Sequence, residues 1–223
     1  MQTHQLQDRQ DLNDLMNGWM HRDLGEWEQL RNLFHPDGTI EITWFEGLAS
    51  DFVEGSMRMG ASDLRTKHMI GSPVVTFNDR GDKAILETNA MIIAENIKLN
   101  IGCECHNRFY DLAEKREGVW KLFHRQSIYD MGIFTFPLGP VEIDSKIAAN
   151  YPREYAALAY LLEQSGFPLG RVFATRDSEL EANMKATQKN GWLSDRLSAG
   201  PNRFRRLVNT RPRGPGREIA VPG

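Results

Sequence analysis

Hydrophobic and polar positions change from helical to strand-like spacing early in the chain. Over residues 8–21, Leu12, Leu15, Met16 and Trp19 recur at helical spacing, and a second helical stretch, LGEWEQLRNLF, follows. The sequence HPDG predicts a turn that ends this second helix, and the alternation in TIEITWF then predicts a strand. The pattern therefore indicates helices first and strands afterwards.

The middle of the chain is predicted to form a loop and then a meander of strands. Residues 46–60, rich in Gly, Ser and Met, are expected to form a loop, and a short helix or turn is expected to lead into His68. Further strand candidates are PVVTF, KAILETNAMIIAENI, KLNIGCECHNRFYDL and VWKLFHRQSIYDMGIF, with a hairpin turn at KREG. This order predicts an α+β fold in which a curved antiparallel sheet wraps its concave face around the helices.

The C-terminal third has a different character. YPREYAALAYLLEQSG predicts an amphipathic helix, and DSELEANMKATQKNGWL predicts another that is N-capped by Asp177 or Ser178. The first of these helices is expected to cover either a pocket mouth or a neighbouring subunit. From residue 199 onward, six arginines alternate with repeated Pro and Gly, which is typical of a flexible arm.

Composition narrows the function classes. A hydrophobic fraction of 40% and a charged fraction of 26% are enough for a packed core. The net charge of −3 leaves no electrostatic footprint for nucleic acid over the main body. No apolar run reaches the length of a membrane span, and the N-terminus is too polar for a signal peptide. We therefore expect a cytoplasmic protein with a small-molecule substrate and with neither nucleic-acid nor membrane partners.

Asp23 and His68 are the first candidates for chemistry. One more turn of the N-terminal apolar stripe reaches Asp23, where another apolar residue is due. His68 stands between Lys67 and Met69, an environment that favours the neutral imidazole that a general base needs. An Asp–His pair would fix the tautomer and stabilise the imidazolium. Two alternatives stay open: Asp23 can cap the following helix, and His68 can be a core histidine whose ring nitrogens are satisfied.

The last predicted strand carries a further candidate. Alternation places Phe123, Arg125, Ser127 and Tyr129 on one face. An arginine beside two aromatic residues can stabilise a departing anion or a developing enolate. The alternative is a surface arginine on a convex face of the sheet.

The sequence CECH on the preceding strand raises the question of a metal. Alternation sends Cys103 and Cys105 to one face and Glu104 and His106 to the other, so one ion cannot collect all four, and we predict no metal site. The spacing of the two cysteines also argues against a disulfide framework. Glu104, His106 and Arg108 either line a pocket or form an exposed ion-pair ladder. Without a glycine-rich phosphate loop, nucleophile elbow or dinucleotide fingerprint, we expect no cofactor.

Three motifs, RDLGEWEQLRNLF, DLRTKHMIGS and EGVWKLFHRQ, are informative together. Over about residues 8–136 they resemble the SnoaL-like group of the NTF2-like superfamily, which includes scytalone dehydratase and hexachlorocyclohexane dehydrochlorinase. The resemblance implies an NTF2-like cone of curved antiparallel sheet, closed by N-terminal helices, and a homo-oligomer, either trimer or dimer. The expected organisation is a catalytic domain over residues 1–140, a helical extension over 141–198 and a flexible tail over 199–223.

The resemblance also implies roles for individual residues. Asp23 and His68 fall where these enzymes place their catalytic Asp–His pair. Arg125 falls where the dehydrochlorinase has a functional arginine in its last strand. His106 falls near a pocket position of scytalone dehydratase and is therefore expected to face the cavity.

The substrate-specific positions depart from the family. Arg22 and Ile42 stand where scytalone dehydratase has two tyrosines, and Ala94 replaces its second pocket histidine. Gly18 stands where the dehydrochlorinase has an assisting lysine. The substrate of neither enzyme can therefore be carried over. The predicted catalytic residues are Asp23, His68 and Arg125, and the predicted substrate-binding residues are Arg22, Ile42, Trp44, His106 and Tyr129.

The resulting hypothesis is a cofactor-independent lyase, either a dehydratase or a dehydrohalogenase, that acts on a small, largely apolar substrate. His68 would be the general base, oriented by Asp23, and Arg125 or a cation near Arg22 would receive the leaving anion. Two alternatives are an isomerase or cyclase that uses the same base without expelling a leaving group, and a binding module without turnover. The mass of the product separates the first two.

Overall fold

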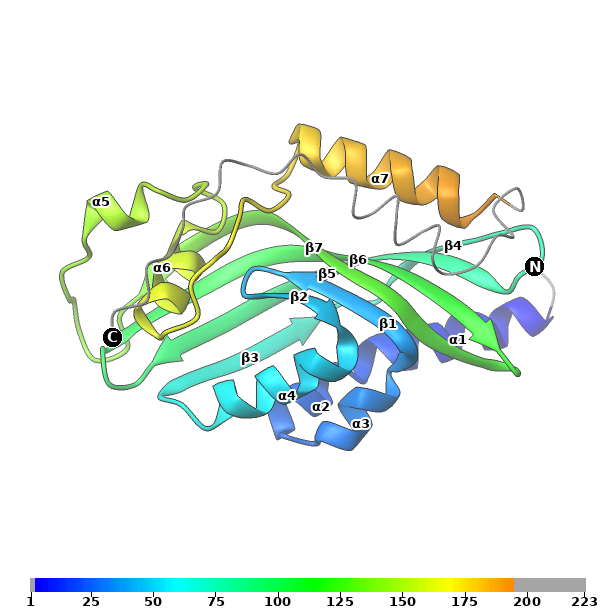
Figure 1. Cartoon of the computed structure of the whole chain (residues 1–223), viewed down its shortest axis with the longest axis horizontal. Helices are drawn as coiled ribbons and strands as arrows, with labels where there is room; N and C mark the ends of the chain where they lie inside the picture. The colour runs from blue at the N-terminus through cyan, green and yellow to red at the C-terminus, as the bar shows by residue number, and fades with distance from the viewer. Residues whose placement is uncertain (1–2, 195–223) are drawn as a thin grey trace, which may run out of the picture.

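The computed structural model describes residues 3–194, with side chains described from residue 5. A long curved sheet dominates the fold (Figure 1), with α1 to α4 on one face, α7 on the other, and α5 and α6 at one end. The tail predicted from residue 199 lies outside the described residues. The helices are α1 (Thr3–Asn17), α2 (Met20–Leu24), α3 (Trp27–Asn32), α4 (Ala49–Gly60), α5 (Ser145–Ala148), α6 (Ala156–Gln164) and α7 (Glu179–Trp192).

The sheet has the order β2-β1-β7-β6-β5-β3, and β4 pairs with β5. All strand pairs are antiparallel except β1 with β7, which is parallel, so the predicted antiparallel sheet is mixed at this one place. The α+β cone with N-terminal helices is confirmed. The strands are β1 (Phe34–Ile42), β2 (Phe45–Leu48), β3 (Leu64–Ile70), β4 (Val74–Phe77), β5 (Lys83–Asn96), β6 (Ile101–Arg116) and β7 (Val119–Thr135).

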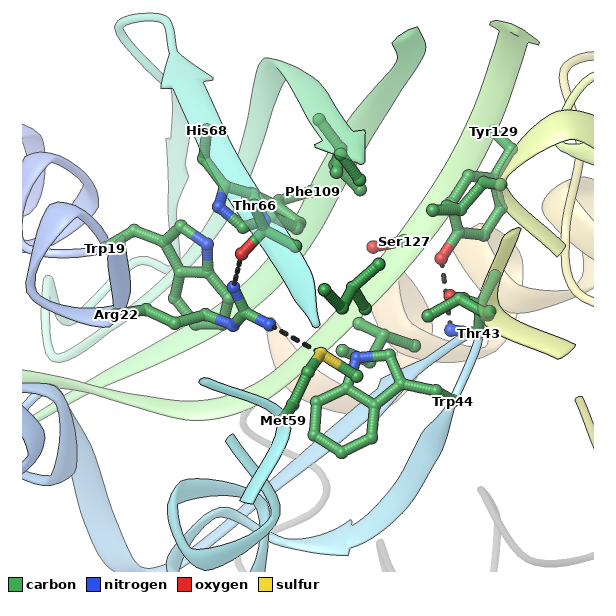
Figure 2. A pocket seen from close by; sticks show the side chains of 16 residues that line it. Trp19, Arg22, Thr43, Trp44, Met59, Thr66, His68, Phe109, Ser127 and Tyr129 are labelled. Carbon is green, nitrogen blue, oxygen red and sulfur yellow. Dashed lines mark hydrogen bonds between the residues drawn. The ribbon is translucent and has the colours of Figure 1, made fainter. Parts of the chain in front are cut away.

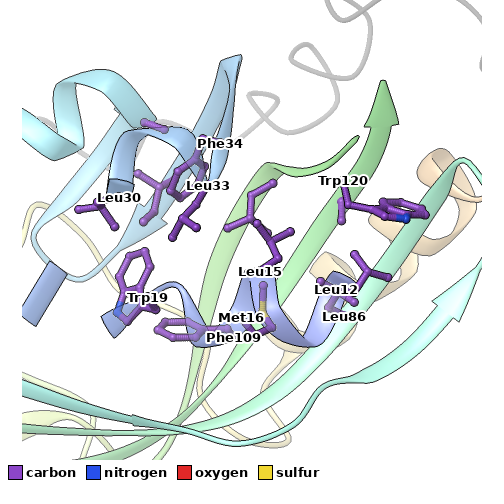
Figure 3. Close-up of a cluster of buried hydrophobic side chains, with 14 of the residues drawn as sticks. Leu12, Leu15, Met16, Trp19, Leu30, Leu33, Phe34, Leu86, Phe109 and Trp120 are labelled. Atoms are coloured by element: carbon purple, nitrogen blue, oxygen red, sulfur yellow. The ribbon is translucent and has the colours of Figure 1, made fainter. Parts of the chain in front are cut away.

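The N-terminal helices pack into the concave face of the sheet as their apolar stripe predicted. Figure 3 shows the stripe of α1 facing Phe109 of β6, and the whole cluster is buried. The helix breaks at Gly18, where a Cβ would lie 2.5 Å from the side chain of Leu33, so only glycine permits this close packing. Gly25 then ends α2 in the left-handed conformation, with φ of 71°. These two glycines place Asp23 on a short, separate helix.

Two local predictions were wrong. HPDG does not end a helix as a turn but forms the beginning of β1. Residues 46–60 are not a loop, because they form β2 and the helix α4. The Gly and Ser content concealed a helical stripe, in which Ala49, Phe52, Val53 and Met59 are buried against the cone. The short helix or turn that was expected to lead into His68 is present as the end of α4 and the turn after it, and His68 itself lies inside β3.

The C-terminal segment closes the open end of the cone. Residues 157–162 of α6 are all buried, so α6 is a core helix rather than an amphipathic one. It packs against β6 and β7 in a cluster that also contains Tyr129 and Met59. Of the two expected sites for this helix, the pocket mouth is the one that it covers. None of the helices in the described part of the chain is long and apolar enough to cross a membrane.

The second C-terminal helix, α7, lies on the convex face. Ser178 caps it, since its hydroxyl accepts a hydrogen bond from the backbone N–H of Glu181. Near its other end Trp192 stacks on Phe123 of β7, with ring centroids 4.8 Å apart. Phe123 therefore lies on the face opposite to Arg125, Ser127 and Tyr129, because an irregularity in the β6–β7 register interrupts the expected alternation.

Candidate active site

A cavity of about 40 Å³ lies between the N-terminal helices, the concave face of the sheet and α6. Its lining is mostly apolar and aromatic, and the side chains drawn in Figure 2 converge on it from α2, α4 and several strands. Leu158 and Leu162 of α6 form part of the wall. The free space is sufficient for only a few water molecules, so α6 and α4 fill most of the cone.

Asp23 and His68 meet at one end of this cavity. The Nδ1 atom of His68 lies 2.6 Å from Oδ1 of Asp23, and the backbone N–H of His68 donates to Oδ2 at 2.7 Å. Both carboxylate oxygens are therefore used by one residue. The side chain of Asp23 is 1% exposed and that of His68 is 6% exposed, so the pair is removed from bulk water. The alternative that Asp23 caps the next helix is not what the structure shows, because α3 begins at Trp27 without a side-chain cap.

The electrostatics of the pair favour a neutral imidazole beside an ionised carboxylate. Burial lowers the pKa of His68, the charges of Arg22 and Arg125 lower it further, and Asp23 only partly opposes them. Burial acts to raise the pKa of Asp23, but the hydrogen bonds and charge of His68 and the charge of Arg22 outweigh it, so this pKa lies below its usual value. Because an ionised carboxylate only accepts hydrogen bonds, Nδ1 carries the proton and Nε2 carries the lone pair. His68 lines the cavity, as a general base would.

Arg22 is the cation of the cavity. Its Nη1 donates to the Thr66 hydroxyl at 2.6 Å, and its Nη2 donates to the sulfur of Met59 at 3.3 Å (Figure 2). The nearest approach to a carboxylate is 3.9 Å, to Asp23. Burial without a close anionic partner lowers the pKa of Arg22 to about 10, at which the guanidinium is still charged at neutral pH.

Arg125 lies elsewhere than predicted. It is fully buried but is not among the residues that line the cavity. Its Nε and Nη2 donate to the two carboxylate oxygens of Asp111 at 2.7 and 2.8 Å, and its guanidinium carbon lies 4.3 and 4.0 Å from the ring centroids of Trp19 and Phe109. Its Nη2 also donates to the Met16 sulfur at 3.3 Å, and its Nη1 has no hydrogen-bond partner among the described residues. Because Arg125 binds both oxygens of Asp111 and does not line the cavity, it is not placed to receive a leaving anion there.

His106 is the second correction. Ile42, Trp44 and Tyr129 line the cavity as predicted, whereas His106 is exposed on the convex face. The concave face of β6 is formed by the odd-numbered positions, including Cys103, Cys105 and Phe109, so an even-numbered residue cannot reach the cavity. On the same convex side, the half-buried Arg108 pairs with Glu87, Asp130 and Glu181, so among the described residues no ion-pair ladder links it to Glu104 and His106.

Several residues that line the cavity were not predicted from the sequence. Trp19, read only as a core residue, lines the cavity beside His68, and its Nε1 has no hydrogen-bond partner among the described residues. Thr66 holds the Arg22 guanidinium. Ser127 lines the wall together with Tyr129, which accepts a hydrogen bond from the backbone N–H of Thr43 at 3.1 Å. For Ser127 the sequence contained one signal, because the alternation along the strand places it on the same face as Tyr129.

Metal ligands do not gather in the part of the chain that the structure describes, since no group of three or more His, Cys, Asp or Glu side chains is suitably placed there. Cys103 and Cys105 point into the core, away from Glu104 and His106. Burial raises the pKa of Cys103 to about 12, so this thiol stays protonated. The absence of a cofactor remains a prediction.

Comparisons with known proteins agree on the domain type. The model of the SnoaL-like domain family matches residues 4–126. An uncharacterized protein of Aspergillus terreus is 29% identical over 180 residues, which cover 71% of this chain and 66% of that protein. Pea pathogenicity protein 2 of Fusarium vanettenii is 28% identical over 167 residues, which cover 70% of each chain. The chain thus spans about two thirds of the length of these relatives.

Solved structures share the fold at low sequence identity. A candidate scytalone dehydratase from Novosphingobium aromaticivorans superposes with a TM-score of 0.53 and 19% identity, covering 64% of this chain and 100% of that one. A type 3 hexachlorocyclohexane dehydrochlorinase from Novosphingobium barchaimii superposes with a TM-score of 0.52 and 16% identity, covering 62% and 97%. At these identities the likeness concerns the fold alone.

Proposed function

Because this chain belongs to the SnoaL-like domain family, as its motifs predicted, we propose that it is a cofactor-independent lyase whose general base is His68. The proposal rests on one observation above the others: a buried Asp23–His68 pair whose imidazole lines a mostly apolar cavity. The substrate would be small and largely apolar, with a hydroxyl or halide that can depart, and its binding would require the side chains around the cavity of about 40 Å³ to move apart.

The proposed reaction is an elimination. The Nε2 lone pair of His68 takes a proton from a substrate carbon, and the electrons of that C–H bond form the new double bond. The leaving group departs from the neighbouring carbon with the electrons of its own bond. A halide leaves as the anion, and a hydroxyl receives the proton held by His68 and leaves as water. A positioned base of this kind contributes about 10²- to 10⁴-fold in rate.

Asp23 would support His68 in two ways. Its hydrogen bond to Nδ1 keeps Nε2 free of a proton in the ground state. Its negative charge would also stabilise the imidazolium that forms when the proton arrives. The second bond, from the backbone N–H of His68, holds the carboxylate in place while this happens.

Arg22 would receive the negative charge that develops on the leaving group. It is the arginine that lines the cavity, and its donors are on a hydroxyl and a thioether rather than on a carboxylate. Such weak partners leave the guanidinium free to turn toward a stronger acceptor. The names of two fold relatives, a dehydratase and a dehydrochlorinase, also favour an elimination. Cytoplasmic location and a homo-oligomeric state remain predictions.

A mass-resolved substrate screen tests the proposal. Small cyclic alcohols, hydroxyketones and halides are incubated with the protein, and a product lighter by water or by hydrogen halide is sought by mass spectrometry. His68→Gln and Asp23→Asn should abolish or strongly reduce its formation. His21→Gln is the matched control, because His21 pairs with Glu26 at the same 2.6 Å but on the surface, 31% and 42% exposed.

The control variant should retain turnover. A product of unchanged mass that depends on His68 would indicate an isomerase or cyclase instead. Binding of the compounds with no turnover, unaffected by Asp23→Asn, would show that the cone is a binding module and would refute the lyase proposal.

A further inference from the structure

A second, larger hollow adjoins the cavity. It measures about 260 Å³ and lies between α2, α4 and the beginning of β3. Four residues, Arg22, Met59, Leu64 and Thr66, belong to the walls of both spaces. The cavity and this second hollow, which we call the α2–α4 cleft, are therefore neighbouring chambers separated by a thin partition.

The Arg22 side chain forms the centre of that partition. Its two hydrogen bonds, to Thr66 on one side and to the sulfur of Met59 on the other, hold the guanidinium across the boundary. A hydrogen bond to a neutral thioether is weak, so Arg22 can exchange it for a charged acceptor on either side. Arg22 is consequently a cation whose hydrogen bonds go to neutral groups and whose nearest carboxylate, that of Asp23, lies at 3.9 Å.

The two chambers differ in polarity. The cavity is mostly apolar, and on the side of α6 its wall is formed by the buried side chains of Leu158 and Leu162. An anion that left in that direction would have to cross packed hydrocarbon, which is very unfavourable. The wall of the α2–α4 cleft is more polar, because it contains Ser56 and Arg65 in addition to Arg22. The Nη1 of Arg65 donates to two backbone carbonyls at the beginning of β3.

The charges around the cleft favour an anion. Arg22 and Arg65 are the cations of its wall and Asp23 is the carboxylate, whose two oxygens already accept hydrogen bonds from His68. The Ser56 hydroxyl, on a residue that is 2% exposed, is buried without a hydrogen-bond partner among the described residues. An unsatisfied buried hydroxyl next to an arginine can donate to a small anion.

We propose that the α2–α4 cleft binds a small monovalent inorganic anion and is the route by which a halide leaving group departs, with Arg22 passing it from the cavity to the cleft. The second part rests on the proposed lyase function, whereas the anion site itself does not. The ligand class is that of halides and similarly small anions.

Iodide quenching of tryptophan fluorescence tests the anion site in the full chain without any substrate. Trp27 lines the cleft, so a bound iodide should quench it with a saturable dependence on concentration, at ionic strength held constant with gluconate, an anion too large for the proposed ligand class. A Trp27→Phe variant identifies that component. Arg22→Met should weaken the saturable quenching at least about tenfold, because a charge-assisted hydrogen bond is lost.

Arg58→Met is the matched control for the change of net charge. Arg58 is exposed on the adjacent helix α4 but does not line the cleft, so its loss should leave the saturable quenching unchanged. Thr66→Val keeps the charge of Arg22 but removes its hydroxyl partner, and it should alter iodide affinity less than Arg22→Met. Purely linear quenching in the wild type, or equal effects of Arg22→Met and Arg58→Met, would overturn the anion site.

The exit route has its own test. A Cβ at Gly60 would lie 3.6 Å from the Trp27 ring, so Gly60→Val narrows the cleft without touching the cavity. It should slow product release and so lower kcat, with the single-turnover rate unchanged. If product release limits turnover and Gly60→Val leaves kcat unchanged, the proposed exit route is refuted. If the lyase screen fails altogether, saturable iodide quenching can still be found, so the two failures are distinguishable.

Discussion

The two buried arginines, Arg22 and Arg125, differ in the groups that accept hydrogen bonds from their guanidinium groups. Arg125 donates to both oxygens of Asp111 and to the Met16 sulfur and lies between two aromatic rings, and its Nη1 has no hydrogen-bond partner among the described residues. Arg22 donates to a hydroxyl and to a sulfur atom. Both charges lower the pKa of His68, yet only Arg22 lines the cavity. Arg125 is thus part of the scaffold, and Arg22 is available to a ligand.

The difference indicates that a buried arginine is available to a ligand when no carboxylate accepts hydrogen bonds from it. A bidentate carboxylate satisfies a guanidinium so well that a substrate anion would have to displace it. A buried arginine without such a partner is energetically unfavourable, and burial accordingly lowers the pKa of Arg22 to about 10. A protein tolerates that arrangement where the charge has another use. Variants of the two residues test whether Arg125 is structural and Arg22 functional.

Removing Arg125 should have the largest effect, and the effect should be on stability. Arg125→Met leaves Asp111, which is 0% exposed, as an unpaired buried carboxylate. Loss of one partner of a buried pair destabilises by about 3–5 kcal/mol. Equilibrium urea unfolding measures this, and Arg125→Met combined with Asp111→Leu should recover most of the loss. A single variant as stable as the wild type would mean that the pair is not structural.

Removing Arg22 should affect turnover more than stability. Arg22→Met removes only a longer ion pair, with Asp23 at 3.9 Å, and Asp23 keeps its two hydrogen bonds from His68, so the urea midpoint should shift less than for Arg125→Met. The turnover number for a substrate found in the screen should fall by about 10²- to 10³-fold, the usual effect of losing one preorganised donor to a developing anion. If both arginine variants lost stability equally and kept their turnover, the comparison would collapse.

The local part of this site was accessible from sequence. Asp23 was found because it interrupts an apolar stripe, and His68 because of its neighbours and the motif around it. Both signals come from short stretches of chain, in which periodicity reports directly on which side is buried. The helices and most strands were predicted for the same reason, and α4 was missed because glycine and serine obscured its stripe.

The partners across the sheet were not accessible. Whether Arg125 is free depends on Asp111, which is its direct neighbour only in the register that β6 and β7 adopt. Register is set by the whole sheet, including irregularities such as the one between His106 and Asn107, and no single strand encodes it. The closing of the cone by α6 is similarly a tertiary outcome, so the small size of the cavity could not be predicted either.

The two arginines should differ in how strongly each lowers the pKa of His68. Since burial and both cations lower its pKa, the wild-type imidazole should stay neutral down to below about pH 6.5, its ordinary value. Turnover should therefore be constant above that pH and fall at lower pH. Stability follows the same sign: the unfolded state binds the proton more readily, so stability is full above about pH 6.5 and decreases as the pH falls toward the folded pKa.

Nuclear magnetic resonance titration of the His68 ring can measure this pKa in each variant, with His68→Gln to assign the signal. Arg22→Met should raise the pKa more than Arg125→Met, because the charge of Arg22 acts on His68 more strongly. A larger rise in Arg125→Met would show that the scaffold arginine is the one that tunes the base. Identical rises would leave only the ligand contacts to separate the two residues.

Replacing His106 should have the smallest effect of all. Like Arg125, His106 was predicted to act in the cavity, but it is exposed on the convex face of β6. His106→Ala should change the free energy of unfolding by no more than about 0.5 kcal/mol, as is usual for an exposed position. Turnover and iodide quenching should match the wild type, in contrast to Arg22→Met. A loss of turnover would mean that the convex face contributes to catalysis in the assembled protein, which a single chain cannot accomplish because the sheet itself separates His106 from His68. Analytical ultracentrifugation of the same sample would then decide whether a second copy supplies the contact.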